Sequence, residues 1–150
     1  MNDAISNIRL APCHPAVIAR VNIAANKLAM EADYFRVVQA LRAYAEQAAL
    51  PPSKTKAPPG YSWHNFGMAV DCAPFLSGTG GAINWDAASP QFQAMRQALT
   101  DAGIPPRGGC PGDGDHFELL EIPLVPTDAD RAAFAAGGLE AVWALYEIAP

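Results

Sequence analysis

Two segments of the chain hold residues that could bind a metal ion. In SWHNFGMAVDC, His64 is followed seven residues later by Asp71, which lies within an apolar run. In GDGDHFELL, His116 follows Asp113 by three residues. A carboxylate buried without a partner is costly. Asp71 therefore either faces water or meets a cation.

The faces of two predicted strands decide which of these side chains can meet. Residues 67–75 and 116–122 are rich in apolar residues at strand spacing, and side chains alternate across a strand. If the two strands pair, Asp71 and His116 can point the same way. His64 then comes from the turn that leads into the first strand.

Two imidazoles and one carboxylate with an open fourth position are typical of a catalytic zinc site. Magnesium and calcium prefer shells made of oxygen alone. A hydrolytic site also needs a general base, for which Asp113 is the best-placed acid and Glu118, on the face of His116, is the competitor. The spacing alone leaves open a second interpretation, in which His64 is a surface histidine and Asp71 a solvated acid.

Taken together, SWHNFGMAVD and DGDHFEL resemble the M15 zinc peptidases, a family that includes D-alanyl-D-alanine carboxypeptidases and phage L-alanyl-D-glutamate endopeptidases. The first family motif is S-x-H-x-x-G-x-A-x-D. The sequence fills every fixed position of this motif, with Ser62, His64, Gly67, Ala69 and Asp71.

Two further elements extend the resemblance over residues 15–120. The second family motif ends in a strand-borne histidine, with a catalytic acid three residues upstream in the endopeptidase branch, and His116 and Asp113 fit that spacing. The third element is an arginine after an early strand, followed by a short helix that carries glutamine. The segment QALRAYAEQAAL supplies Arg42 and Gln47.

The resemblance implies a ligand set and a base. His64, Asp71 and His116 would hold one zinc ion per chain. Asp113 would act as the general base and would later return a proton to the leaving amine.

The resemblance also implies three residues of a substrate cleft. Arg42 would stabilise negative charge on the scissile carbonyl or hold a substrate carboxylate, which agrees with the charge stabilisation that amide hydrolysis requires. Ser62 and Gln47 would line the cleft. From the residues alone, Arg42 could also be a surface residue at a helix start, and Gln47 a solvated helix residue. The family often has glycine two residues before the arginine, where this chain has Ala40.

The HFEL ending and the aspartate three residues before His116 favour the endopeptidase branch. We therefore expect a zinc-dependent peptidoglycan peptidase that cuts the stem peptide at the L-alanyl-D-glutamate bond, of phage or prophage origin. One alternative is a D,D-carboxypeptidase or dipeptidase acting on D-Ala-D-Ala. Another is a non-catalytic zinc-containing domain that binds wall fragments or supports a virion.

Composition excludes several other classes. The 150 residues are 51% hydrophobic and 17% charged, which predicts one soluble domain over residues 1–150. The formal net charge of -5 argues against nucleic acid as a partner. No apolar run approaches the roughly 20 residues of a membrane helix. The N-terminus lacks a secretory signal, so we expect cytoplasmic synthesis, release to the wall by another factor, and a monomer.

Three cysteines, one histidine and one loop stand apart from these motifs. Cys13, Cys72 and Cys110 are an odd number without a CxxC pair, which favours buried free thiols. His14, between Cys13 and a proline, is expected to be structural or exposed, and not a metal ligand. The Pro-rich basic segment PPSKTKAPPGY could contact the anionic wall or be solvated.

A mixed fold must position the ligands. The patterns predict strands at 33–41, 67–75 and 116–122, and helices at 15–32, 42–50 and 89–103. Two short Ala-rich helices broken at Gly137-Gly138 would form a C-terminal extension over 127–148, with Trp143 and Leu145 buried. The predicted class is α+β: a small antiparallel sheet that carries the zinc site, flanked by helices.

Overall fold

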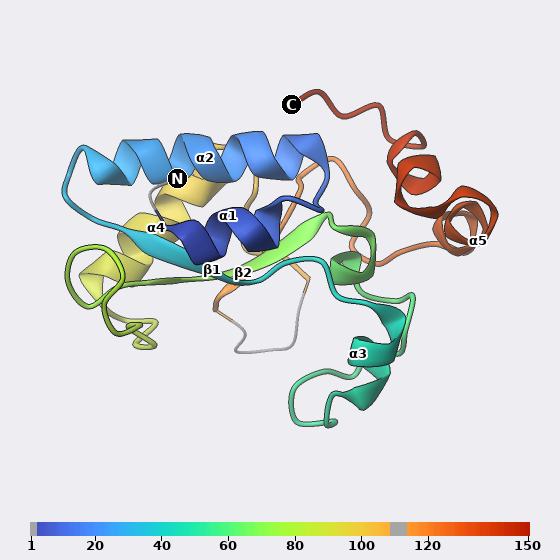
Figure 1. Ribbon diagram of the computed structural model, residues 1–150, viewed down its shortest axis with the longest axis horizontal. Coiled ribbons are helices and arrows are strands. Elements are labelled where there is room, and N and C mark those ends of the chain that lie inside the picture. Colours follow the sequence, from blue (N-terminus) through green and yellow to red (C-terminus); the bar gives the residue numbers. More distant parts are fainter. Residues whose placement is uncertain (1–2, 109–113) are drawn as a thin grey trace.

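A small antiparallel sheet lies at the centre of the computed structural model, which describes residues 3–108 and 114–150 (Figure 1). Its strands are β1 (Phe35–Gln39), β2 (Ala69–Pro74) and β3 (His116–Glu118), in the order β1-β2-β3. Both neighbouring pairs are antiparallel. The predicted α+β class is confirmed.

The register of β2 and β3 sets Asp71 directly opposite His116. Directly opposed residues of an antiparallel pair hold their side chains on the same face. The predicted pairing of these two strands is therefore confirmed. The third strand is shorter than the predicted 116–122, because the chain beyond Glu118 leaves the sheet and the Leu120 amide bonds to the Gly103 carbonyl.

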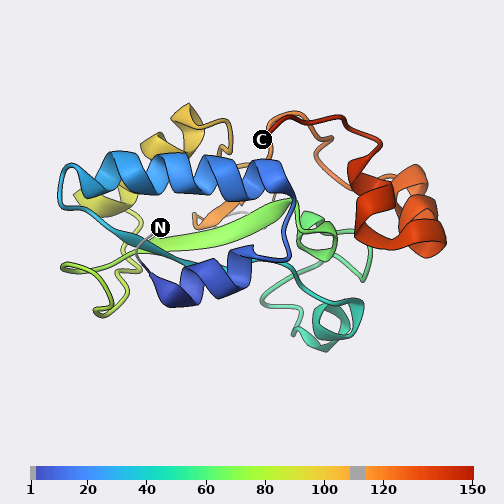
Figure 2. The ribbon, with the colours of Figure 1, turned by 45° about the horizontal axis from the view of Figure 1, so that its top comes forward.

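Helices α2 (Pro15–Ala29) and α4 (Pro90–Asp101) pack against each other, and α4 also contacts β2. Figure 2 shows α2 running along the length of β2. The core between these elements is fully buried and apolar, and includes Val17, Val21, Val70, Met95, Leu99 and Phe117. Because side chains alternate along a strand, Asp71 and His116 point to the face of the sheet opposite Val70 and Phe117.

Local signals explain where the helices begin and end. The Ser89 hydroxyl accepts from the Phe92 amide at the start of α4, and Gly103, with φ of 84°, follows its end. His14 caps α2 because its Nδ1 accepts from the Ala16 amide, and it is buried, so of the two expected roles the structure shows the structural one.

Two short helices follow β1 and precede β2: α3 (Tyr44–Ala49), within the predicted 42–50, and the 3-10 helix η1 (Trp63–Phe66). The sequence patterns did not predict η1, nor the N-terminal α1 (Ala4–Leu10), which contacts β1. Both Cys13 and Cys72 are free and buried, as predicted, whereas Cys110 lies outside the described residues.

The C-terminal helix α5 (Asp128–Trp143) lies at one end of the molecule (Figure 1). Its backbone is non-helical at Gly137 and Gly138, which confirms the predicted break. Trp143 is only half-buried and donates from its indole nitrogen to the Phe66 carbonyl at 2.7 Å. The prediction that Leu145 is buried is wrong: it is 50% exposed, beyond the helix end. No helix in the described part of the chain is long and apolar enough to cross a membrane.

Candidate metal centre

Three elements bring the predicted ligands together. His64 comes from η1, Asp71 from the middle of β2 and His116 from the first position of β3. Gly67 ends η1 with φ of 64°, in the left-handed region, where a Cβ would lie 3.2 Å from the Cα of Cys13. This turn directs the chain from His64 into the strand that carries Asp71.

The three side chains converge on one point. His64 Nε2 lies 3.0 Å from Asp71 Oδ1 and 3.1 Å from His116 Nδ1. His116 Nδ1 lies 2.9 Å from the same Asp71 oxygen. The two imidazoles are almost fully buried, and the Asp71 side chain keeps 17% of its surface exposed. One atom from each residue could bind the same metal ion.

The outer nitrogen of each imidazole has its own acceptor. His64 Nδ1 lies 2.7 Å from the Ala40 carbonyl, which can only accept, so this nitrogen carries the proton. His116 Nε2 donates to Glu118 Oε1 at 2.9 Å. In the neutral tautomers, both remaining lone pairs then face Asp71. Such a donor set fits a cation, and the outer acceptors are those that hold metal-binding histidines in place.

The charges of the cluster agree with this fit. Burial favours a higher pKa for Asp71, but the charge of His64 and hydrogen bonds from both histidines outweigh it and lower the pKa. Burial favours a lower pKa for His116, but its bonds to Asp71 and Glu118 raise the pKa to about 10. Both shifts hold for imidazoles that carry protons toward Asp71, and a metal ion at this point would replace those protons.

Glu118 is held as a partner of His116. The residue is 3% exposed, and its Oε2 has no hydrogen-bond partner among the described residues. Arg107 Nε lies 3.9 Å from that oxygen. The sequence predicted Glu118 only as a rival to Asp113 for the role of general base. Its spacing of two from His116, on the same face of the strand, was the signal for this supporting role.

Arg42 lies beside the cluster, fixed by its backbone and its side chain. Its amide donates to the His64 carbonyl, and its carbonyl accepts from Asn65 Nδ2, both at 2.9 Å. Its Nη2 lies 3.6 Å from Asp71 Oδ2, and its Nη1 donates to Gln47 Oε1 at 2.9 Å. Sequence reasoning did not single out Asn65, although it lies inside the first motif.

Gln47 was expected to line the cleft, but it is not among the residues that do so. It is 2% exposed, and its amide nitrogen donates to the Ala57 carbonyl and to Thr55 Oγ1. Its Oε1 accepts from Arg42 Nη1, so this buried side chain bonds to Arg42 on one side and to the 55–57 loop on the other. Its chemistry is therefore that of a residue that positions Arg42.

A cleft of about 260 Å³ opens over the cluster. His64, Asp71 and His116 line it together with Arg42 and Ser62, and the loop that carries Lys54 and Lys56 forms part of its wall. Asp113, the predicted base, lies outside the described residues, so its place in the site stays a prediction.

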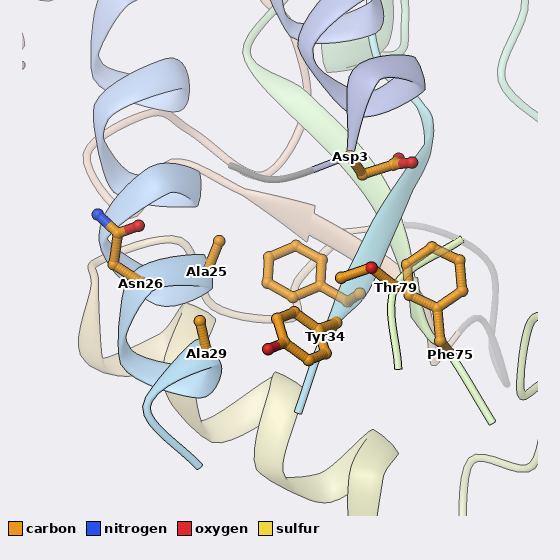
Figure 3. A pocket seen from close by; sticks show the side chains of 8 residues that line it. Asp3, Ala25, Asn26, Ala29, Tyr34, Phe75 and Thr79 are labelled. Atoms are coloured by element: carbon orange, nitrogen blue, oxygen red, sulfur yellow. The ribbon is translucent and has the colours of Figure 1, made fainter. Parts of the chain in front are cut away.

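A second hollow lies between α2 and β1, away from the metal cluster (Figure 3). Its volume is about 20 Å³, enough for a single water molecule. Its lining includes Ala25, Tyr34 and Phe75, with Asp3 at the edge (Figure 3). The larger cleft is the one that brings polar side chains together.

Two solved structures share this fold. The L-Ala D-Glu endopeptidase ChiX of Serratia marcescens is 29% identical, with a TM-score of 0.54, over 77% of this chain and 86% of that one. The L,D-carboxypeptidase DacB of Streptococcus pneumonia is 18% identical, with a TM-score of 0.50, over 92% of this chain and 78% of that one. The second likeness shows the fold alone. No family model and no curated protein matches the chain.

Proposed function

We propose that this chain, whose resemblance to the M15 zinc peptidases the structural matches bear out, is a zinc-dependent peptidoglycan peptidase. The observation that carries the proposal is the convergence of His64, Asp71 and His116 with both outer imidazole nitrogens already hydrogen-bonded. We assign these three residues as ligands of one zinc ion per chain.

Zinc at this position would supply Lewis-acid polarisation of the scissile carbonyl and of the attacking water. The rest of the reaction falls to the chain's own residues. Arg42 lies at the cleft with its guanidinium oriented by Gln47, where it can stabilise the negative charge that develops on the carbonyl oxygen. These hydrogen bonds orient Arg42 before substrate binds, which lowers the cost of reorganisation during the reaction.

Asp113 is the proposed general base. It would take a proton from the attacking water and deliver a proton to the leaving amine. The three-residue spacing from His116 supports this assignment. Glu118 is the weaker candidate, because its carboxylate is buried and bonded to His116. Ser62, on the wall of the cleft, is a proposed contact for the substrate.

The proposed scissile bond is L-alanyl-D-glutamate in the stem peptide. The match to ChiX, an L-Ala D-Glu endopeptidase, supports this choice over other peptide bonds. We further propose that the protein acts as a monomer, in the manner of a phage endolysin, on the cell wall after another factor has released it.

A digest of purified peptidoglycan tests the proposal. The wild type should release fragments with a new D-Glu amino terminus, identified by mass spectrometry, and a zinc chelator such as phenanthroline should abolish this release. Asp71→Asn should be inactive, whereas the control Asp101→Asn should remain active, because Asp101 is exposed and pairs with Lys27 outside the cleft.

Other products would point to the alternatives. Free D-Ala without new D-Glu termini would identify a D,D-carboxypeptidase, for which Arg42 could hold the terminal carboxylate. Stoichiometric zinc without any cleavage would favour a wall-binding or virion domain. Full activity in the absence of zinc would overturn the proposal.

A further inference from the structure

Two lysines lie on the wall of the cleft that holds the metal cluster. Lys54 and Lys56 line this cleft together with His64 and Asp71. Both lysines are exposed, and neither forms an ion pair with a residue that the structure describes. The chain as a whole has a formal net charge of -5, so these cations are concentrated here against the overall charge.

The described acids of the cleft are already engaged elsewhere. Asp71 contacts His64, His116 and Arg42. Glu118 is buried and bonded to His116. Since neither acid pairs with Lys54 or Lys56, the two ammonium groups remain available to an anion that enters the cleft.

The loop that carries the lysines is fastened to the metal site. Gln47 accepts from Arg42 through its oxygen and donates from its nitrogen to Thr55 Oγ1 at 3.2 Å and to the Ala57 carbonyl at 2.8 Å. Thr55 Oγ1 also accepts from the Ala57 amide at 3.1 Å. One buried amide therefore holds the residues on either side of Lys56, and the lysine backbone is set relative to Arg42.

We propose that Lys54 and Lys56 bind a carboxylate of the substrate peptide other than the scissile group, and so select an acidic peptide. The inference rests on the proposed function. In a glutamyl residue linked onward through its γ-carboxyl, the α-carboxylate stays free close to the L-alanyl bond, which makes it the natural occupant. A carboxylate bound by two ammonium groups in a partly enclosed cleft is attracted more strongly than one in open solvent.

Paired substrates test this inference. Two soluble stem peptides would be compared, identical except that the glutamyl α-carboxylate is free in one and a primary amide in the other. The wild type should prefer the free carboxylate in kcat/KM. The Lys54→Ala, Lys56→Ala double variant should lose about three- to tenfold on the carboxylate peptide, the size expected of two exposed ion pairs, and less than about twofold on the amide.

Two control variants and a salt titration isolate the effect of the positive charge of Lys54 and Lys56. Lys27→Ala removes a lysine that pairs with Asp101 outside the cleft, and should leave both rates unchanged. The Lys54→Arg, Lys56→Arg double variant should retain the preference. Raising the salt concentration should reduce the preference of the wild type, because exposed charges are screened.

The outcomes separate the two proposals. Hydrolysis of neither peptide, nor of whole peptidoglycan, by the wild type would overturn the proposed function and this inference with it. Hydrolysis of both peptides with equal efficiency by the wild type would overturn the lysine assignment alone. So would an equal loss on both peptides in the alanine double variant.

Discussion

Glu118 accepts a hydrogen bond from His116 Nε2 at 2.9 Å, and the two residues lie two positions apart on the same strand. The carboxylate is 3% exposed, so water competes little for this bond. The bond fixes the tautomer of His116 and turns its Nδ1 toward Asp71. A buried acid beside the cluster thus orients a metal ligand that lines the same cleft.

Glu118→Gln should weaken zinc binding by about 10- to 100-fold, the usual cost of losing the outer partner of a metal-binding histidine. The affinity can be measured by competition with a chromogenic chelator. Glu121→Gln is the matched control, since Glu121 is exposed and pairs with Arg20 away from the cluster. An unchanged affinity in Glu118→Gln would show that the His116 ring is held by packing instead.

Gly108→Ala should displace the Glu118 carboxylate or the loop that carries Gly108. A Cβ at this position would lie 2.3 Å from Glu118 Oε1, so Glu118 or the loop must move. Gly78→Ala is the control, because both glycines have positive φ but Gly78 has nothing within 4 Å of the added Cβ. The strain of the left-handed backbone is therefore common to both variants. We expect Gly108→Ala to have the lower zinc affinity and the lower urea midpoint, and equal values would contradict the contact.

Asp113→Ala should show whether Asp113 acts as the general base or binds the metal. Loss of a general base costs about 10²- to 10⁴-fold in rate, whereas zinc content should stay at one per chain. Metal analysis and peptidoglycan digestion on the same preparation would check both. A variant that loses zinc would make Asp113 a ligand, and one with undiminished activity would move the base to another residue.

Ionisation of Asp3 should make the free energy of unfolding depend on pH at low pH. Hydrogen bonding to Arg36 is the main cause that lowers the pKa of Asp3, with further bonds from Ser6. A lowered pKa means that the folded state binds the proton less readily than the unfolded chain. The stabilisation is thus complete above the ordinary pKa, near 4, and is lost as pH falls through the lower pKa of the folded state.

Urea unfolding of wild type and Asp3→Asn across pH would test this. The variant should be less stable at pH 7, and the difference should shrink toward pH 2. A difference that stays constant with pH would mean that ionisation of Asp3 does not stabilise the fold, because asparagine caps a helix about as well as aspartate does.

The ligand set could be predicted because its signals are local. Alternation along a strand placed Asp71 and His116 on one face, and the first motif placed His64 at the entry to that strand. In each case neighbouring residues carry the information.

The missed features depend on distant partners. Helix α1 has only seven residues, too few to be stable alone, and its cap residue Asp3 pairs with Arg36 on β1. The burial of Gln47 follows from the fold of the loop at Thr55 and Ala57, which no period in the sequence encodes. The register that ends β3 at Glu118 likewise depends on the loop after α4.

The sequence spacing of the ligands means that a bound metal ion would also stabilise the fold. His64 and Asp71 are 7 residues apart, so they can chelate locally, whereas Asp71 and His116 are 45 apart and their joining closes a long loop. The unfolded chain does not hold these ligands together, so the free energy of zinc binding adds to the stability of the folded state. The described cysteines are free, and β3 has three residues. A bound zinc ion would therefore cross-link this edge strand to β2 and raise the melting temperature.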